Sequence, residues 1–386
     1  MSGDVDLLVL GGGCAGLALG RELAHRNIGL STLIIEPRAR YEEDRTWCFW
    51  QRKGETCNAP VAARWGQWRL SAGTRAVTHT GSEWHYAMVR SGAYYEQAIA
   101  AITASPKIHL QTGARAGRVS ADDRGASIET GTGTIRARWV VDTRPPDRAR
   151  LARSPLTQVF SGAEIVSDED VFDPDTALVM DRLRSDSGQI AFDYILPLSS
   201  RRALIEHTVF STRPLDPQAL DIACDAEIDR RVGNAARFIR RERGSLPMGL
   251  PEMPAALGSI VAAGTRAGAL RASSGYGFCR IQAWATACAD ELAAGRAPIP
   301  QHKDPAYRLF MDKVFLNALT HDLHAGPDIF IALADALPPD GFARFMSDAA
   351  SPLDWMRTVL ALPRRRFLSE ALSQVFARHV RPEPAG

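Results

Sequence analysis

The hydrophobic pattern of the first 36 residues describes a strand, a glycine turn, a helix and a second strand. An apolar run over residues 6–10 leads into Gly11-Gly12-Gly13-Cys14-Ala15-Gly16, and a helix-like stretch follows. A second apolar run over residues 33–36 ends in Glu36. A βαβ unit of this kind normally belongs to a parallel sheet that helices cover on its faces.

Each glycine of the Gly11-x-Gly13-x-x-Gly16 spacing has a physical task. One makes the tight turn, one lets backbone amides approach a pyrophosphate, and one lets the helix pack close to the strand. The helix N-terminus also offers free N–H groups and a partial positive charge. Glu36 lies 20 residues beyond Gly16, where an acid accepts a hydrogen bond from a ribose hydroxyl. The sequence therefore predicts a dinucleotide that is held by Gly11, Gly13, Cys14, Ala15, Gly16 and Glu36.

The next segments return to this sheet and then leave it. Residues 94–104 have helical spacing, and strands are predicted at 108–110, 126–128 and 134–142. The last of these ends in Asp142 and is a plausible neighbour of the first strand. Residues 189–196 and 202–210 then alternate on either side of a short turn. This pattern predicts an antiparallel hairpin, and hence a second sheet.

After residue 255 the chain is predicted to return to the dinucleotide domain. A small-residue strand at 258–264 runs into glycine, and a helix begins at about residue 281. Helical patterns continue from residue 307 to about 378. We therefore expect a discontinuous cofactor-binding domain (1–155 and 255–300), an antiparallel-sheet substrate domain (156–254) and a helical C-terminal region (301–386).

Composition narrows the class of protein. The 386 residues are 45% apolar and 23% charged, which is an ordinary globular balance, and the length suggests two or three domains. A net charge of +2 argues against a nucleic-acid binder. The six cysteines form no CxxC pair, and we see no signal peptide, so reduced thiols in a cytoplasmic setting are expected. No cluster of ligands predicts a metal, and no apolar run predicts a membrane span.

A dinucleotide fold used twice and interrupted by an antiparallel sheet resembles the glutathione-reductase-type flavoproteins. The predicted fold class is therefore α/β, with a Rossmann-type FAD-binding domain, and the resemblance favours FAD over NAD. It implies that the late glycine segment, Gly264 to Gly268, touches the flavin. Asp142, at the end of the strand 134–142, and Gly275 are further predicted cofactor contacts. An Asp often follows the late glycine in such proteins, whereas this chain has Thr265 and Arg266.

Glu206 is the first candidate for chemistry. It lies in the apolar strand 203–210, and a carboxylate on an apolar face is desolvated, which raises its pKa and suits it to general acid work. Alternatively, its face is exposed or it pairs with Arg202. His207 points to the opposite face and is interpreted as structural. Asp181 is either a second acid or a strand end.

Two further segments stand out. Trp47, Phe49 and Trp50 follow the second strand, and they either line an apolar tunnel near a flavin or pack in the core. Glu242 and Arg243 precede a glycine and could form an ion pair that shapes a loop.

Together these motifs resemble the bacterial FAD-dependent lycopene β-cyclases. The match runs in order along almost the whole chain, and the segments after the glycine turn are the specific ones. They are Arg45-Thr-Trp-Cys-Phe49, Met180-Asp181, Phe192-x-Tyr194-x-Leu196-Pro-Leu-Ser199, Leu204-Ile-Glu-x-Thr208, Arg241-Glu-x-Gly244-x-Leu-Pro247, Gly264-x-Arg-Ala-Gly268, Gly275-Tyr276, Asp312-Lys-Val-Phe315 and Ala361-Leu-Pro-Arg-Arg-Arg-Phe-Leu368.

The resemblance implies a reaction and its residues. Glu206 would protonate the terminal double bond of a linear carotenoid, lycopene or a relative, and the cation would close a six-membered ring. Aromatic faces stabilise a carbocation. The lining residues would be Trp47, Phe49, Asp181, Phe192, Tyr194 and Tyr276.

The flavin would be reduced, with NAD(P)H as reductant, and there would be no net redox change. An insoluble substrate implies peripheral attachment to the inner membrane, for which Arg364-Arg-Arg366 are candidates. The competing hypothesis is a redox flavoenzyme, either a prenyl-chain reductase or a flavin monooxygenase. A non-catalytic flavin-binding protein is less compatible with the carboxylate strand and the aromatic cluster.

Overall fold

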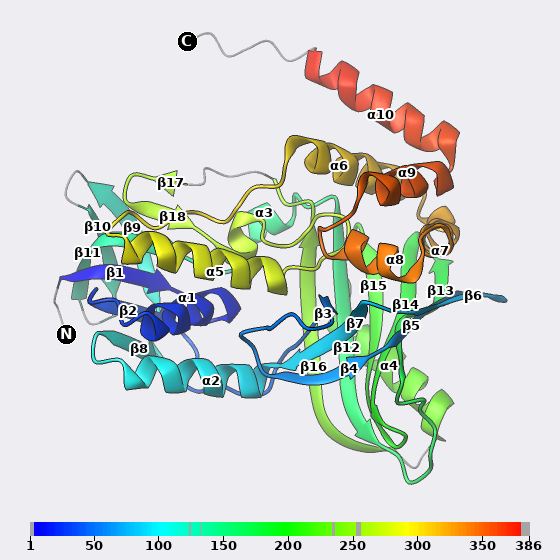
Figure 1. The fold of residues 1–386 in the computed structure, drawn as a ribbon, viewed down its shortest axis with the longest axis horizontal. Coiled ribbons are helices and arrows are strands. Elements are labelled where there is room, and N and C mark those ends of the chain that lie inside the picture. Colours follow the sequence, from blue (N-terminus) through cyan, green and yellow to red (C-terminus); the bar gives the residue numbers. More distant parts are fainter. Residues whose placement is uncertain (1–3, 123–124, 132, 234–235, 252–255, 380–386) are drawn as a thin grey trace.

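The N-terminal βαβ unit forms the centre of a parallel sheet. The computed structural model describes residues 4–122, 125–131, 133–233, 236–251 and 256–379 (Figure 1). β1 (Val5–Leu10) leads through α1 (Cys14–His25) to β2 (Thr32–Glu36), as predicted. β1 is parallel both to β2 and to β11 (Gly133–Asp142), so the predicted return of the chain to this sheet is confirmed.

The order of this sheet is β17-β18-β11-β1-β2-β8, and β9 and β10 form an antiparallel extension of β11. The strand β18 is parallel to β11, so the late small-residue segment also returns to the first sheet, as expected. The remaining strands are β8 (Ile108–Thr112), β9 (Ala116–Asp122), β10 (Gly125–Thr130), β17 (Ala256–Leu257) and β18 (Ile260–Ala262).

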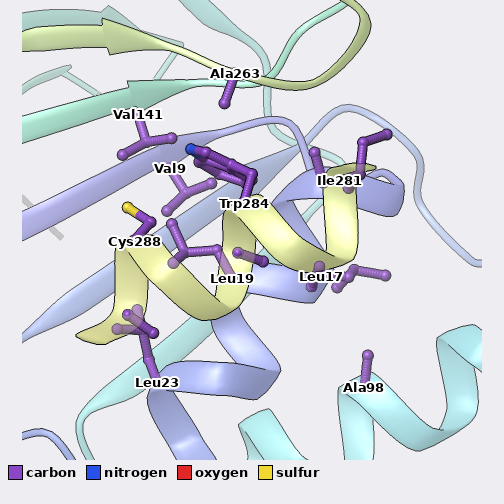
Figure 2. Close-up of a cluster of buried hydrophobic side chains, with 14 of the residues drawn as sticks. Val9, Leu17, Leu19, Leu23, Ala98, Val141, Ala263, Ile281, Trp284 and Cys288 are labelled. Carbon is purple, nitrogen blue, oxygen red and sulfur yellow. The ribbon is translucent and has the colours of Figure 1, made fainter. Parts of the chain in front are cut away.

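Helices α1, α2 (Ser91–Ala104) and α5 (Phe278–Ala293) pack against the sheet and against one another. Figure 2 shows the core that they enclose, with Val9 and Val141 reaching from the strands toward Leu19 of α1 and Trp284 and Cys288 of α5. All five side chains are fully buried. This core holds the glycine turn and the start of α1 in place.

A second, seven-stranded sheet has the order β16-β12-β15-β14-β13-β5-β6. Its strands are β5 (Gln67–Ala72), β6 (Arg75–Thr80), β12 (Leu156–Val166), β13 (Thr176–Asp186), β14 (Gln189–Ser199), β15 (Arg202–Ser211) and β16 (Arg237–Met248). All neighbours are antiparallel except β13 and β5. The predicted hairpin is the pair β14–β15.

The second sheet draws strands from two parts of the chain. β5 and β6 lie within residues 1–155, the span that we predicted for the cofactor-binding domain, yet they extend the seven-stranded sheet beside β13. Sequence spacing gives no sign of this pairing because β5 and β13 are separated by about a hundred residues of chain. Helix α4 (Pro217–Val232) covers one face, where Ile205, Cys224 and Ile228 form a small core.

The remaining elements connect the two sheets and close one end of the second. β3 (Thr46–Arg52), β7 (Trp84–Arg90) and β4 (Val61–Trp65) form a three-stranded sheet. The helices that follow α5 gather beside the ends of the long strands (Figure 1). They are α6 (Ala306–His321), α7 (Gly326–Ala336), α8 (Pro339–Met346), α9 (Pro352–Ala361) and α10 (Arg364–His379). Among the described residues, no helix is both long and apolar enough to cross a membrane.

Candidate functional site

One cavity of about 1110 Å³ joins the two sheets and the C-terminal helices. Its wall includes Gly11 and Gly13 of the glycine turn, Glu206 of β15 and Trp355 of α9, and most of the wall is apolar. We call it the central cavity. It is large enough for a ligand of more than drug size, and it brings the predicted dinucleotide site and the predicted acid into one space.

At the first end of the central cavity, Gly11 makes the predicted tight turn and Gly16 permits the predicted close packing of the helix. Gly11 has a φ of +101°, which only glycine adopts without strain. A Cβ on Gly16 would lie 1.9 Å from the carbonyl oxygen of Gly11, so only glycine lets the helix pack this close. A Cβ on Gly13 would meet no atom within 4 Å, because this residue faces open space in the cavity wall. The N-terminus of α1, at Cys14 and Ala15, lies in the same wall.

Glu36 ends β2 beside this turn and is 4% exposed. Its carboxylate accepts hydrogen bonds from the Gly12 amide at 2.7 Å and from the amide and the Nε of Arg38 at 2.9 Å each. Glu36 and Arg38 both line the central cavity. The first end therefore offers a turn with open backbone, a helix N-terminus and a fixed carboxylate, which are the parts that a dinucleotide needs.

Some of the predicted cofactor contacts do not line the cavity themselves but hold the residues that do. Asp142 ends β11 and binds the guanidinium of Arg144 at 2.8 Å, while Arg266 lies 3.2 Å away. Gly264 and Gly268 begin and end a short 3-10 turn with φ of +68° and +79°. Arg144 and Arg266 reach the wall, as does Gly275, whereas Gly16, Asp142, Gly264 and Gly268 lie outside it.

Glu206 lines another part of the central cavity, which we call its second end, and is 7% exposed. In the register of the sheet it lies opposite Tyr194 of β14 on one side and Gly162 of β12 on the other. Glu242 of β16 lies opposite the same glycine. Two buried carboxyl groups therefore flank one glycine in the middle of the sheet.

The pKa of Glu206 is raised well above its ordinary value, first because burial removes water and second because the negative charge of Glu242 is near. A hydrogen bond to Glu242 raises it further, because the protonated carboxyl donates and the Glu242 carboxylate accepts, while the charge of Arg240 acts in the opposite direction. Burial and Glu242 therefore both favour the protonated form of Glu206, which is the direction of the pKa shift that we expect for a carboxyl group in an apolar strand.

The rows of side chains on either side of Glu206 differ sharply. On one side, Glu164 of β12 accepts from Arg90, Arg202 and Arg240 at 2.7–2.9 Å. On the other, the next register row holds Phe160, Thr208 and Phe192, all of which line the central cavity. Glu206 thus stands where an ionic cluster ends and an apolar wall begins.

These contacts decide the alternatives that the sequence left open. Arg202 pairs with Glu164 rather than with Glu206. His207 faces away from the cavity and lies 2.8 Å from Asp193, so it is a structural histidine.

The suggested ion pair between Glu242 and Arg243 is wrong. Adjacent residues of a strand point to opposite faces. Arg240 is therefore the partner of Glu242, and Arg243 pairs with Asp221 on the other face.

The aromatic residues of β3 divide between its two faces. Trp47 and Phe49 share the face that stacks on Phe278 of α5, at 5.5 and 5.3 Å between ring centroids. Trp47 still reaches the cavity wall, whereas Phe49 is core. Cys48 and Trp50 point the other way and line the cavity. Sequence reasoning named the cluster but missed this division, because nothing in the sequence says which side of β3 faces the cavity.

Asp181 also lies outside the cavity wall. Its carboxylate accepts from the hydroxyl of Ser71 at 2.5 Å and pairs with Arg231 of α4. The neighbouring Met180 and Val179 line the cavity in its place. The register of β13 is irregular on both sides of Asp181, so alternation counted from the sequence does not hold there.

Three tyrosines form a hydroxyl cluster beside Glu206. The hydroxyl of Tyr86 lies 2.5 Å from that of Tyr194 and 2.8 Å from that of Tyr276. All three line the central cavity, and burial raises the pKa of each, so they stay neutral. Tyr194 and Tyr276 were predicted, whereas Tyr86 of β7 was missed. The alternation of Trp84, Tyr86 and Met88 was the available signal.

Comparison with known proteins agrees with this geometry. Residues 6–372 match the family described as "Lycopene cyclase protein". The chain belongs to the lycopene cyclase family. It is 34% identical over 161 residues to the lycopene beta-cyclase of Paracoccus sp. (strain N81106 / MBIC 01143). That alignment spans 40% of this chain and 41% of the relative, so it covers about two fifths of each protein.

Solved structures share the fold. A geranylgeranyl bacteriochlorophyll reductase-like protein from Thermoplasma acidophilum has a TM-score of 0.61 at 16% identity, covering 98% of this chain and 100% of that one. The flavin-dependent monooxygenase PieE, solved in complex with FAD and substrate, has a TM-score of 0.58 at 13% identity, covering 99% and 77%. These likenesses confirm the predicted fold class, a flavoprotein fold with a Rossmann-type domain and a separate sheet.

Proposed function

We propose that this protein is a lycopene β-cyclase that closes the linear ends of lycopene to β-ionone rings by acid–base chemistry. The observation that carries the proposal is the position of Glu206. A buried carboxyl group lines a large, mostly apolar cavity, and the wall of the same cavity includes the predicted dinucleotide-binding turn. Membership of the lycopene cyclase family supports the substrate class.

FAD is the proposed cofactor at the first end of the cavity, and NAD(P)H is the proposed source of its electrons. The residues there fit it: Gly11 and Gly13 leave the backbone open, Cys14 and Ala15 present the helix N-terminus, and Glu36 offers acceptor oxygens. When bound in its reduced form, the flavin would supply negative charge to the cavity in which the cation forms, with no net transfer of electrons.

The chain's own residues carry the proton chemistry. The carboxyl of Glu206 gives its proton to one carbon of the terminal double bond, and positive charge develops on the other carbon. The neighbouring internal double bond attacks this carbon and closes a six-membered ring, and the carboxylate left on Glu206 takes up the proton that the ring then loses. One proton is gained and one is lost, so the product has the mass of the substrate.

The wall that the described residues form around Glu206 can stabilise a carbocation without offering a free nucleophile to trap it. Trp50, Phe192 and Tyr194 present aromatic faces, which stabilise positive charge in a dry site. The hydroxyls of Tyr86, Tyr194 and Tyr276 are engaged with one another. Apolar side chains then continue from Phe210 to Phe330, at 5.7 Å between ring centroids, and to Phe315 and Phe367 under the C-terminal helices. This path accommodates the rest of a long polyene.

We further propose that the outer faces of α9 and α10 attach the protein peripherally to the inner membrane. Trp355 and Leu362 line the cavity from within, whereas Met356, Leu360 and Leu368 are 52%, 54% and 62% exposed. Arg364 and Arg365 are exposed beside them and suit anionic head groups, while Arg366 is held by Asp322. The substrate would then enter the cavity from the bilayer.

The membrane proposal predicts that Met356→Asp with Leu360→Asp weakens binding to anionic phospholipid vesicles by about tenfold or more, since two apolar contacts become charged. Ile222→Asp on α4 is the matched control, because Ile222 is 64% exposed on the second sheet's covering helix. Vesicle co-sedimentation measures both. Equal loss of binding in the two variants would contradict this surface.

The cyclase proposal is tested with the protein, FAD, NADPH and lycopene in liposomes under anaerobic conditions. We expect cyclic products of unchanged mass. A gain of hydrogen would identify a prenyl-chain reductase instead, and in the presence of oxygen a gain of oxygen would identify a monooxygenase. Chromatography with mass spectrometry separates these outcomes.

A further inference from the structure

We propose that Glu242 is a positioning residue that holds the acid Glu206 in place and in its protonated form, and that Gly162 is what lets the two carboxyl groups meet. This inference rests on the proposed role of Glu206 and extends it to two residues that do not line the cavity.

The register of the sheet brings the groups together. β12 runs between β15 and β16, and Gly162 faces Glu206 on one side and Glu242 on the other. A Cβ on Gly162 would lie 2.5 Å from the Cγ of Glu206 and 3.3 Å from its Oε1. The Glu206 side chain therefore leans over the glycine toward β16. Any side chain at position 162 would stand between the two carboxyl groups.

Glu242 is held more firmly than Glu206. Its Oε2 accepts from the hydroxyl of Thr46 at 2.8 Å and pairs with Arg240. Arg240 also donates to Thr46 and to Glu164, at 2.9 Å each. The Glu242 side chain is 1% exposed and lies behind the cavity wall, so it acts on the substrate only through Glu206. A carboxylate fixed in this way is a pre-oriented acceptor for a proton on Glu206.

Among the groups of the described residues that face Glu206, only Glu242 and Arg240 bring a charge that affects its protonation. Arg240 is the nearby cation, and it is shared with Glu242 and Glu164. Cys48 of β3, Tyr194 of β14 and Tyr276 before α5 face Glu206 as well, and Cys224 of α4 lies behind the sheet. Burial raises the pKa of each of these thiols and phenols, so all four are neutral when Glu206 reacts.

The pair also explains how the acid is reset. Transfer of the proton from Glu206 to the substrate leaves two buried carboxylates side by side, which repel one another. This repulsion favours return of a proton to Glu206 before the next substrate reacts. Arg240 and Thr46 bind Glu242 with their donors, so the returning proton goes to Glu206.

The test uses Glu242→Gln in the FAD-loaded protein. Without the second charge, Glu206 ionises at lower pH, so the alkaline limb of the cyclisation profile moves to lower pH. The rate at about pH 8 falls on the order of tenfold, and it recovers on acidification. Glu227→Gln is the matched control, because Glu227 is a buried carboxylate that pairs with Arg230 and Arg231 of α4, behind the same sheet. The alkaline limb of the pH profile of Glu227→Gln should lie at the same pH as in wild type.

A second readout does not depend on cyclase activity. Infrared titration of the substrate-free holoprotein follows the carboxylic acid C=O stretch, assigned to Glu206 by its loss in Glu206→Gln. We expect this band to disappear at lower pH in Glu242→Gln than in wild type. If wild type does not cyclise lycopene but the band still shifts, the proposed function fails and the carboxyl pair stands.

Gly162→Ala tests the glycine. The added methyl group displaces Glu206 from Glu242 and from the substrate, and cyclisation is expected to fall about 100-fold while FAD binding persists. Wild-type activity in Gly162→Ala, or an unchanged pH limb and band in Glu242→Gln, would overturn the proposal.

Discussion

The two ends of the central cavity each hold a buried carboxyl group, and their surroundings are opposite. Glu36 accepts from three donors, the amides of Gly12 and Arg38 and the guanidinium of Arg38. Glu206 faces a second carboxylate and an apolar wall. The same functional group is therefore prepared for two tasks: one end presents an acceptor to a ligand, and the other stores a proton. Neighbouring donors, rather than burial, make the difference.

Glu206→Gln tests the difference between the two carboxyl groups with the largest expected effect. An amide keeps the shape but has no acidic proton, so cyclisation is expected to fall by about 1,000-fold or more, within the range of general acid catalysis. FAD binding should be unchanged, because it belongs to the other end of the cavity. Product formation and flavin fluorescence measure the two ends separately. Wild-type turnover in this variant would remove Glu206 from its role.

Glu36→Gln is the reciprocal change and has a smaller expected effect. The amide carries no charge and offers one acceptor oxygen in place of two, so the dissociation constant for FAD should rise by about tenfold. Cyclisation should recover as the FAD concentration is raised, which Glu206→Gln does not allow. Isothermal titration and rate measurements at several FAD concentrations check this. A loss that added FAD cannot restore would mean that the two ends are not separate.

The two ends of the cavity also differ in how much of their geometry could be predicted from the sequence. The glycine turn, the start of α1 and Glu36 lie within one short βαβ unit, and local spacing carries their geometry, so the tight turn at Gly11 and the close helix packing at Gly16 were confirmed. Alternation within one strand was enough to place Glu206 on an apolar face.

The partners of Glu206 come from distant strands. Gly162 and Glu242 meet it through strand register, and Thr46 reaches Glu242 from a different sheet. A single sequence contains no signal for such registers. The errors at Phe49 and Asp181 have the same origin, because a strand's alternation tells which residues share a face but not what that face contacts.

The smallest expected effects are those on the free energy of unfolding, and for Glu206→Gln and Glu36→Gln they have opposite signs. As the pH rises above the ordinary glutamate value of 4.5, the unfolded chain releases the proton of Glu206 first, because its pKa is raised in the folded protein. Wild type therefore loses stability between that value and the raised pKa, whereas Glu206→Gln does not.

At about pH 8, Glu206→Gln is expected to be more stable than wild type by about 1–2 kcal/mol, and the difference should vanish below about pH 4. Glu36→Gln should be less stable by about 1–3 kcal/mol at the same pH, because buried donors lose their acceptor. Thermal unfolding of the cofactor-free proteins measures both. Shifts of the same sign would show that the surroundings of the two carboxyl groups are more alike than their contacts indicate.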